Sequence, residues 1–81
     1  MTIIWTNKSW REMSRLSRNL QRRIDNVLKR LQETGIGLQK CSEIRPDEYR
    51  LRCGDYRIIL NNDGQRRFVV SRISFRDKAY R

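Results

Sequence analysis

Two short runs of alternating residues flank the dipeptide Gly54-Asp55. Tyr49-Arg50-Leu51-Arg52-Cys53 precedes it, and Tyr56-Arg57-Ile58-Ile59-Leu60 follows it. A Gly-Asp dipeptide between such runs is typical of a hairpin with a two-residue loop. Because successive side chains of a strand point to opposite faces, we expect the arginines on one face of the hairpin and the apolar side chains on the other.

In this register Arg52 lies directly opposite Arg57, and Arg50 lies two positions along the same strand. Two unit charges about 5 Å apart repel each other by roughly 1 to 3 kcal/mol at effective dielectrics between those of water and a protein surface. A sheet selected only for stability would avoid this pairing. The hairpin therefore predicts a site for an anion.

The charge balance indicates the same class of ligand. The chain has 81 residues, which predicts a single domain over residues 1–81, and it contains 19 Lys and Arg against 9 Asp and Glu, a formal net charge of +10. Such an excess favours a polyanion or an acidic partner as ligand. Some of these cations are expected simply to face solvent on helices, among them Arg22, Arg23, Lys29 and Arg30, with docking on ribosomal RNA as the alternative.

Histidine is absent from the sequence. This excludes a Ser-His-Asp triad, a histidine general base and a Cys/His zinc site, and we expect neither a metal nor a cofactor. Cys41 and Cys53 allow at most one bridge and are expected to be buried apolar groups. Because there is no N-terminal apolar region and no run of about 18 apolar residues, we expect a cytoplasmic protein that does not contact a membrane.

Before the hairpin the pattern changes from strand to helix. Thr2-Ile3-Ile4-Trp5 is expected to form a strand, and Ser9-Trp10-Arg11-Glu12 has the spacing of a capping box that opens a helix. Ser17-Arg18-Asn19 is expected to divide the following segment into two antiparallel helices, with Gly35 as the stop. The apolar stripe of this segment comprises Trp10, Met13, Leu16, Leu20, Ile24, Val27, Leu28 and Leu31. The connector from Gly35 to Asp47 leaves room for a short edge strand.

After the hairpin, Asn62-Asp63-Gly64-Gln65 predicts a second two-residue loop of type I′. In that register Arg57 lies beside Val70 and Arg72 joins the charged face, although a one-residue bulge would reverse this. The tail, residues 76–81, is expected to form a last helical turn or a folded-back loop. The predicted fold is α+β, with an N-terminal strand and a helical hairpin packed on one face of a small antiparallel sheet. The other face, which carries the arginines of the hairpin, is expected to stay open.

The block from Tyr49 to Ile59 and the ending Ile73-Ser74-Phe75-Arg76-Asp77-Lys78-Ala79-Tyr80-Arg81 resemble the RelE/ParE toxin superfamily of type II toxin-antitoxin systems, most closely the RelE-type messenger-RNA interferases. The resemblance spans nearly the whole chain and implies a β-α-α-β-β-β order. It also implies a ribosome-dependent endoribonuclease that cleaves messenger RNA in the ribosomal A site and inhibits translation.

The resemblance assigns roles residue by residue. Arg50 and Arg52 match the paired basic residues of one strand and are expected to hold RNA phosphates. Arg57, Arg76 and Tyr80 match the catalytic positions. In this reaction the ribose 2′-hydroxyl attacks the adjacent phosphorus, so guanidinium groups stabilise the developing charge. Without histidine, Tyr80 is the candidate for proton transfer, because surrounding guanidinium charge favours its phenolate form.

Several alternatives stay open. Phe75 stands where many relatives carry histidine or lysine, and it is a candidate for stacking on a base. The default expectation for Phe75, as for Trp5 and Trp10, is a place in the core or in an interface. Tyr80 could instead pack on the sheet edge, Arg76 could pair with Asp77, and Arg50 or Arg52 could form a surface ion pair with a neighbouring carboxylate, namely that of Glu43, Asp47 or Glu48. At the level of function, the rivals are a ParE-like, non-enzymatic inhibitor of DNA gyrase and a degenerate or purely RNA-binding member. The expected partners are a RelB-like antitoxin in a toxin-antitoxin hetero-oligomer, the ribosome and messenger RNA.

Overall fold

A computed structural model of the chain describes residues 2–35, 38–40, 47–64 and 66–75. These residues form two helices and five strands. The elements are β1 Thr2–Trp5, α1 Asn7–Ser14, α2 Arg18–Thr34, β2 Leu38–Lys40, β3 Glu48–Cys53, β4 Tyr56–Asn62 and β5 Arg67–Phe75. Within this part of the chain, neither helix is long and apolar enough to span a membrane.

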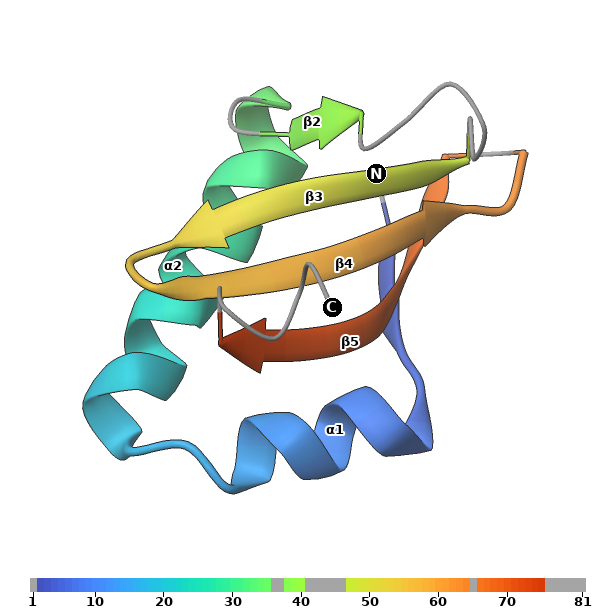
Figure 1. The fold of residues 1–81 in the computed structure, drawn as a ribbon. Coiled ribbons are helices and arrows are strands. Elements are labelled where there is room, and N and C mark those ends of the chain that lie inside the picture. Colours follow the sequence, from blue (N-terminus) through green and yellow to red (C-terminus); the bar gives the residue numbers. More distant parts are fainter. Residues whose placement is uncertain (1, 36–37, 41–46, 65, 76–81) are drawn as a thin grey trace.

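The described strands form one sheet in the order β1-β5-β4-β3-β2. The strands from β2 to β5 pair antiparallel, whereas β1 pairs with β5 in parallel and makes the sheet mixed. Figure 1 shows α2 crossing behind the sheet and α1 lying along its lower edge beside β5, so the two helices meet at an angle instead of running side by side. The predicted α+β class is confirmed, and β2 is the short edge strand for which the connector left room.

The helix boundaries follow from local capping. Thr6, not Ser9, caps α1: the Thr6 side chain accepts from the Ser9 backbone N–H at 3.0 Å, and Ser9 Oγ accepts from the Thr6 N–H at 3.1 Å. The predicted box at Ser9 and Glu12 is therefore wrong by one turn. The predicted break is confirmed, because Ser17 caps α2 by accepting from the Leu20 N–H at 3.2 Å. Gly35 ends α2 with a φ of 73°.

Glu12 has a different role, at the edge of β5. The short strand β1 covers only Arg67 to Val70 of that edge. Beyond it, the Glu12 carboxylate accepts a hydrogen bond from the Ile73 backbone N–H at 2.9 Å. An unpaired strand edge invites aggregation, so α1 completes the edge that β1 leaves open.

The hydrophobic core lies between the helices and one face of the sheet. It consists of Met13, Ile24, Leu28, Leu31, Leu51, Cys53, Ile58, Leu60, Phe68, Val70 and Ile73. Trp10 belongs to the predicted stripe but is 57% exposed, and its ring packs edge-on against Trp5 with the centroids 5.4 Å apart. Neither α1 nor α2 lies over the opposite face of the sheet (Figure 1).

Candidate functional site: an arginine face on the sheet

The hairpin of β3 and β4 sets the arginine pairing. Gly54 and Asp55 form its two-residue loop, since Cys53 pairs with Tyr56, and Arg52 pairs directly with Arg57, as predicted. Gly54 has a φ of 59°, and no non-glycine residue in the described ranges has a positive φ, which is the pattern of a type II′ turn. The local sequence therefore determines that two arginines oppose each other.

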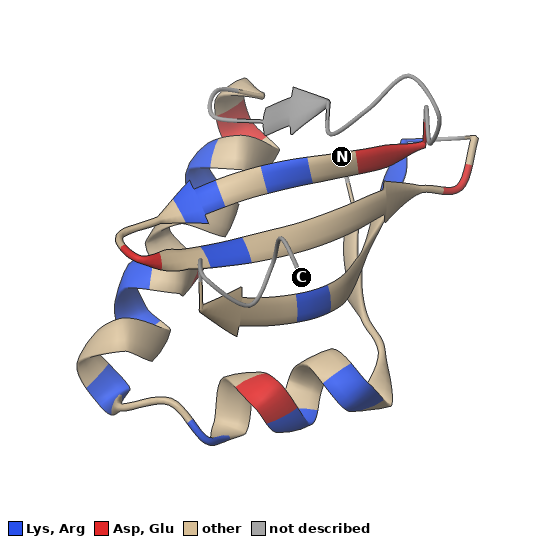
Figure 2. Ribbon diagram, in the orientation of Figure 1, with Lys and Arg blue, Asp and Glu red and all other residues tan. Residues whose placement is uncertain are grey.

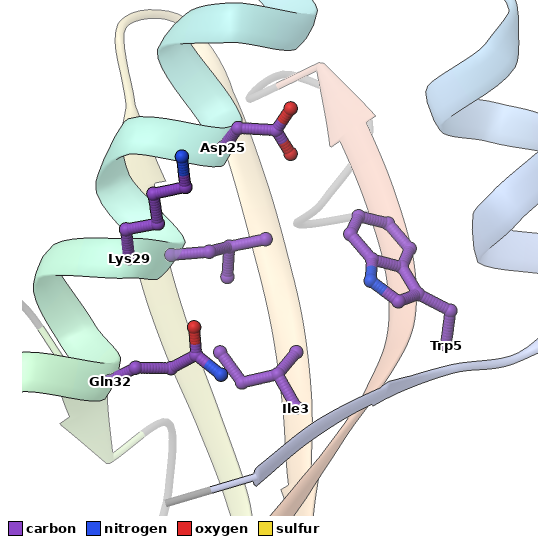
Figure 3. Close-up of a pocket in the computed structure, with 6 residues that line it drawn as sticks. Ile3, Trp5, Asp25, Lys29 and Gln32 are labelled. Carbon is purple, nitrogen blue, oxygen red and sulfur yellow. The ribbon is translucent and has the colours of Figure 1, made fainter.

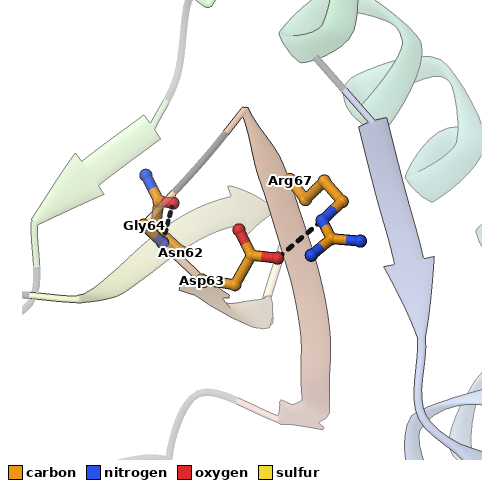
Figure 4. A network of polar contacts seen from close by, with 4 residues as sticks. All are labelled: Asn62, Asp63, Gly64 and Arg67. Atoms are coloured by element: carbon orange, nitrogen blue, oxygen red, sulfur yellow. Dashed lines mark hydrogen bonds and ion pairs between the residues drawn. The ribbon is translucent and has the colours of Figure 1, made fainter.

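The second hairpin differs from the prediction. β4 ends at Asn62 and β5 begins at Arg67, so the loop is longer than two residues, and Asn62 pairs with Phe68. Two polar contacts hold the loop (Figure 4): Asn62 Oδ1 accepts from the Gly64 N–H at 2.9 Å, and Arg67 Nε lies 2.6 Å from Asp63 Oδ2. A side chain that bonds the backbone two residues on favours this wider turn over the type I′ loop.

A β-bulge in β5 then changes which side chains of the strand point to the charged face. The register shifts between Ile59 and Leu60: Leu60 pairs with Val70, whereas Ile59 pairs with Arg72. Ser71 is the extra residue, and its Oγ donates to the Ile59 carbonyl oxygen at 3.1 Å. Arg72 consequently lies on the charged face. Arg57 pairs with Ser74, so the predicted pairing of Arg57 with Val70 is wrong.

We call the four arginines on this side of the sheet the arginine face: Arg50, Arg52, Arg57 and Arg72. They occupy two rows across three strands. In one row Arg52, Arg57 and Ser74 are neighbours, and in the other Arg50 and Arg72 flank Ile59. Neighbouring strands lie about 4.8 Å apart, and alternate residues of one strand about 6.8 Å apart. Figure 2 shows these basic positions on β3, β4 and β5.

Burial differs sharply among the four arginines. Arg52 and Arg72 are exposed and Arg50 is half-buried. Arg57 is only 6% exposed, and its Nε and Nη1 atoms are shielded from solvent. A guanidinium presents five donors in a planar fork suited to phosphate or carboxylate, and a charge in a region of lower dielectric acts more strongly on a bound anion. The arrangement is thus one buried cation beside three that are more exposed to solvent.

Phe75 lies on the other side of the sheet. It pairs with Tyr56, which packs against the core, and the two rings meet edge-on with centroids 5.4 Å apart. Strand alternation places it on the same side as Ile73, away from the arginine face. The side chain is 41% exposed, and its role in base stacking stays a prediction.

Three of the five predicted catalytic and phosphate-binding residues therefore come together on one face, namely Arg50, Arg52 and Arg57. Arg76 and Tyr80 lie outside the described residues. Arg72 and Ser74 join this face through the bulge. The signal for the bulge is present in the sequence, because Val70 and Ile73 are both apolar at an odd spacing that a regular strand would place on opposite faces.

The thiol of Cys53 lies on the core side, 4% exposed. Burial raises the pKa of the Cys53 thiol, and the nearby guanidinium of Arg23 acts in the opposite direction. Arg23 also approaches the turn, because a Cβ on Gly54 would lie 3.0 Å from Arg23 Nη2. The predicted role of Cys53 as a buried group is confirmed, whereas Cys41 lies outside the described residues.

A groove of about 230 Å³ lies between β1 and α2. Figure 3 shows Ile3 and Trp5 on its strand side and Asp25, Lys29 and Gln32 on its helix side. Its lining is mixed in polarity, and the arginine face contributes nothing to it. We therefore assign the candidate site to the arginine face.

Comparison with known proteins gives a family and a set of similar folds. The sequence model of the family described as "ParE toxin of type II toxin-antitoxin system, parDE" matches residues 3–80. No curated protein matches the sequence significantly.

Among solved structures, a YoeB/ParE toxin from Agrobacterium tumefaciens is 18% identical, with a TM-score of 0.74 over 93% of this chain and 98% of that one. The RelBE2 toxin-antitoxin complex from Mycobacterium tuberculosis contains a chain that is 17% identical, with a TM-score of 0.76 over 93% and 96%. The RelB-RelE complex from Methanococcus jannaschii gives 20% identity and a TM-score of 0.71 over 95% and 94%. At these identities the likeness is one of fold.

Proposed function

Because the chain belongs to the ParE toxin family of type II toxin-antitoxin systems, within the RelE/ParE superfamily, we propose that it is a toxin that cleaves messenger RNA on the ribosome. In this proposal it is an endoribonuclease of the RelE type that inhibits translation in the cytoplasm. The observation that carries the proposal is the direct pairing of Arg52 with a nearly buried Arg57 on the side of the sheet opposite the core. Like charges in this position reduce stability and favour binding of a phosphate.

The chemistry assigned to this face is attack of a ribose 2′-hydroxyl on the adjacent phosphorus. The 2′-oxygen forms the new bond, the bond to the 5′-oxygen of the next nucleotide breaks, and the products are a 2′,3′-cyclic phosphate and a 5′-hydroxyl. Negative charge grows on the non-bridging oxygens in the transition state. A guanidinium that is already fixed stabilises this charge without reorganising, and burial makes Arg57 the best-positioned group for that role.

The remaining roles follow the sequence resemblance. Arg50 and Arg52 hold the substrate phosphates, and Arg76 adds a second guanidinium at the scissile phosphate. Tyr80 takes the proton from the 2′-hydroxyl, and the leaving 5′-oxygen receives a proton from solvent or from a ribosomal group. The ribosome orients the message, which allows a site without histidine to function.

The proposed regulator is an antitoxin. Two of the similar folds were solved as complexes of a toxin with a RelB antitoxin. For this chain, with its net charge of +10, we propose an antitoxin of that type whose acidic side chains meet the arginine face and form a toxin-antitoxin hetero-oligomer. The antitoxin and the message then compete for the same guanidinium groups.

The second candidate is a ParE-like inhibitor that binds DNA gyrase without catalysis. The description of the matching family favours it. In that function the arginine face is a docking surface, and no proton carrier is needed.

Primer extension on a message translated in vitro distinguishes the two functions. The mRNA-cleaving toxin gives cuts at codon positions that appear with the protein and disappear when ribosomes are omitted. A supercoiled plasmid with gyrase, incubated with the same protein, stays unaffected. The opposite pattern, an intact message together with altered supercoiling, supports the gyrase inhibitor and overturns the proposal.

A further inference from the structure

Ser74 has a buried hydroxyl group on the arginine face. The residue is 7% exposed, and its Oγ is shielded from solvent and makes no hydrogen bond to any residue that the structure describes. It pairs with Arg57 across the β4-β5 ladder, at the end of the row that begins with Arg52. Its neighbours on this face are therefore cationic donors.

The other serines near the core differ from Ser74. Ser9 is fully buried, and its Oγ accepts from the Thr6 N–H and donates to the Thr6 carbonyl oxygen. Ser71, three residues before Ser74 on the same strand, donates to the Ile59 carbonyl oxygen. A buried hydroxyl without a partner lowers stability, and alanine would fit the same position without that penalty. The hydroxyl of Ser74 is thus better explained by a ligand than by the fold.

The position of Ser74 defines the ligand. A residue pair directly opposed on neighbouring strands holds its Cβ atoms about 5 Å apart, so a single group of phosphate size can contact both side chains. The Nε and Nη1 atoms of Arg57 are shielded together with Ser74 Oγ. A phosphate oxygen accepts several hydrogen bonds at once, and it accepts both O–H and N–H donors.

We propose that Ser74 Oγ–H and the Arg57 guanidinium bind the same phosphoryl group, with Ser74 donating to one of its non-bridging oxygens. This inference rests on the proposed function, because the group bound there is the phosphate of the RNA substrate. It adds Ser74 to the site as a phosphate-binding residue. The β-bulge at Ser71 is the feature that places Ser74 there, since it sets the register after Val70.

The test measures phosphate binding and stability together, without requiring RNA cleavage. Inorganic phosphate is titrated at constant ionic strength, and binding is followed by NMR at the Ser74 backbone amide and the Arg57 Nε–H. Ser74→Ala is expected to weaken phosphate binding about tenfold, which is the usual effect of losing a hydrogen bond to a charged group. Its thermal midpoint is expected to equal or exceed that of the wild type.

Ser71→Ala is the matched control, with the same atoms removed from the same strand. Because Ser71 has a hydrogen bond within the fold, this variant is expected to lose stability and to keep wild-type phosphate affinity. The inference is overturned if Ser74→Ala binds phosphate as the wild type does, if Ser74→Ala melts at a lower temperature, or if the wild type shows no saturable shift. Phosphate binding through Ser74 without RNA cleavage would instead count against the proposed function alone.

Discussion

Arg57 combines two properties that rarely occur together, a buried guanidinium and a like-charged neighbour directly across the strand. Arg52 is exposed, so solvent screens most of the repulsion, and the penalty is at most about 1 kcal/mol. A bound phosphate would remove that penalty and add charge-assisted hydrogen bonds. In the proposed function, the repulsion within this pair therefore favours the phosphate-bound protein over the unliganded one.

Replacing Arg52 by glutamine tests whether the pair lowers the stability of the unliganded protein. We expect Arg52→Gln to raise stability by up to about 1 kcal/mol at low salt, because it removes the repulsion from Arg57, and we expect the gain to fade at high salt. Urea unfolding at two ionic strengths measures both effects. Arg22→Gln, which removes one exposed charge from α2, is the control. A loss of stability in Arg52→Gln alone would mean that the pair is not repulsive.

Cys53 gives a prediction about pH. Burial raises the pKa of its thiol, so the folded state holds a proton that the unfolded chain releases above about pH 8.5. The contribution of Cys53 to stability is thus fully present below that pH and is lost as pH rises, by up to about 1.4 kcal/mol per pH unit. Between pH 7 and 10, the free energy of unfolding measured by chemical denaturation should decline less steeply in Cys53→Val than in the wild type. Equal slopes in the two proteins would contradict the assignment.

At the level of single elements, β5 shows why Ser74 was not predicted as part of the site and why Arg72 reaches the predicted face through a different register. Its apolar residues Phe68 and Val70 follow one alternation, and Ile73 and Phe75 follow the other. A bulge reconciles the two, and only then do Arg72 and Ser74 share a face with Arg57. The first hairpin was predictable because a two-residue Gly54-Asp55 loop fixes its register. The second was not, because the side chains of Asn62, Asp63 and Arg67 select a wider loop.

A contact between α1 and β5 was also missed by the sequence analysis. Glu12 was assigned to a capping box from its spacing alone, whereas its carboxylate accepts a hydrogen bond from the Ile73 N–H, 61 residues away in sequence. Such a contact depends on how α1 packs and cannot be found in a local pattern. The capping residue itself, Thr6, had a detectable signal in the Ser9 three positions later.

Removing the Glu12 carboxylate tests whether it stabilises the edge of β5. Glu12→Ala leaves the Ile73 N–H without its acceptor, so we expect a loss of about 1 to 3 kcal/mol and a thermal midpoint lowered by several degrees. Glu12→Gln keeps an acceptor oxygen and should recover most of the loss. Amide hydrogen exchange at Ile73 should accelerate in the alanine variant only. Unchanged exchange there would show that the contact does not protect the strand edge.

At the scale of the whole molecule, the fold separates two kinds of surface. The helices and the core occupy one side of the sheet, and strand pairing places four arginines from three strands on the other. Strand alternation places Arg50, Arg52 and Arg57 on this side, so the sequence predicted which side carries charge. It did not predict the burial of Arg57, which depends on tertiary packing.

Binding of single-stranded RNA should depend steeply on salt. Each phosphate contact that is lost lowers the slope of log affinity against log salt by about 0.7. We expect Arg50→Ala and Arg72→Ala each to lower the slope by about this amount, and Arg22→Ala, on α2, to leave it unchanged. Fluorescence anisotropy with a labelled, non-cleavable RNA measures the slopes. Equal slopes in all four proteins would show that RNA does not bind on the arginine face.

In the proposed function, the guanidinium of Arg57 stabilises the transition state of RNA cleavage. The most direct measurement is the single-turnover rate of message cleavage on programmed ribosomes, with saturating toxin. For Arg57→Ala, checked for folding by circular dichroism, we expect a rate about 10² to 10³ times lower than that of the wild type, whereas Arg22→Ala should cleave at the wild-type rate. Cleavage by Arg57→Ala at the rate of the wild type would contradict this role of Arg57.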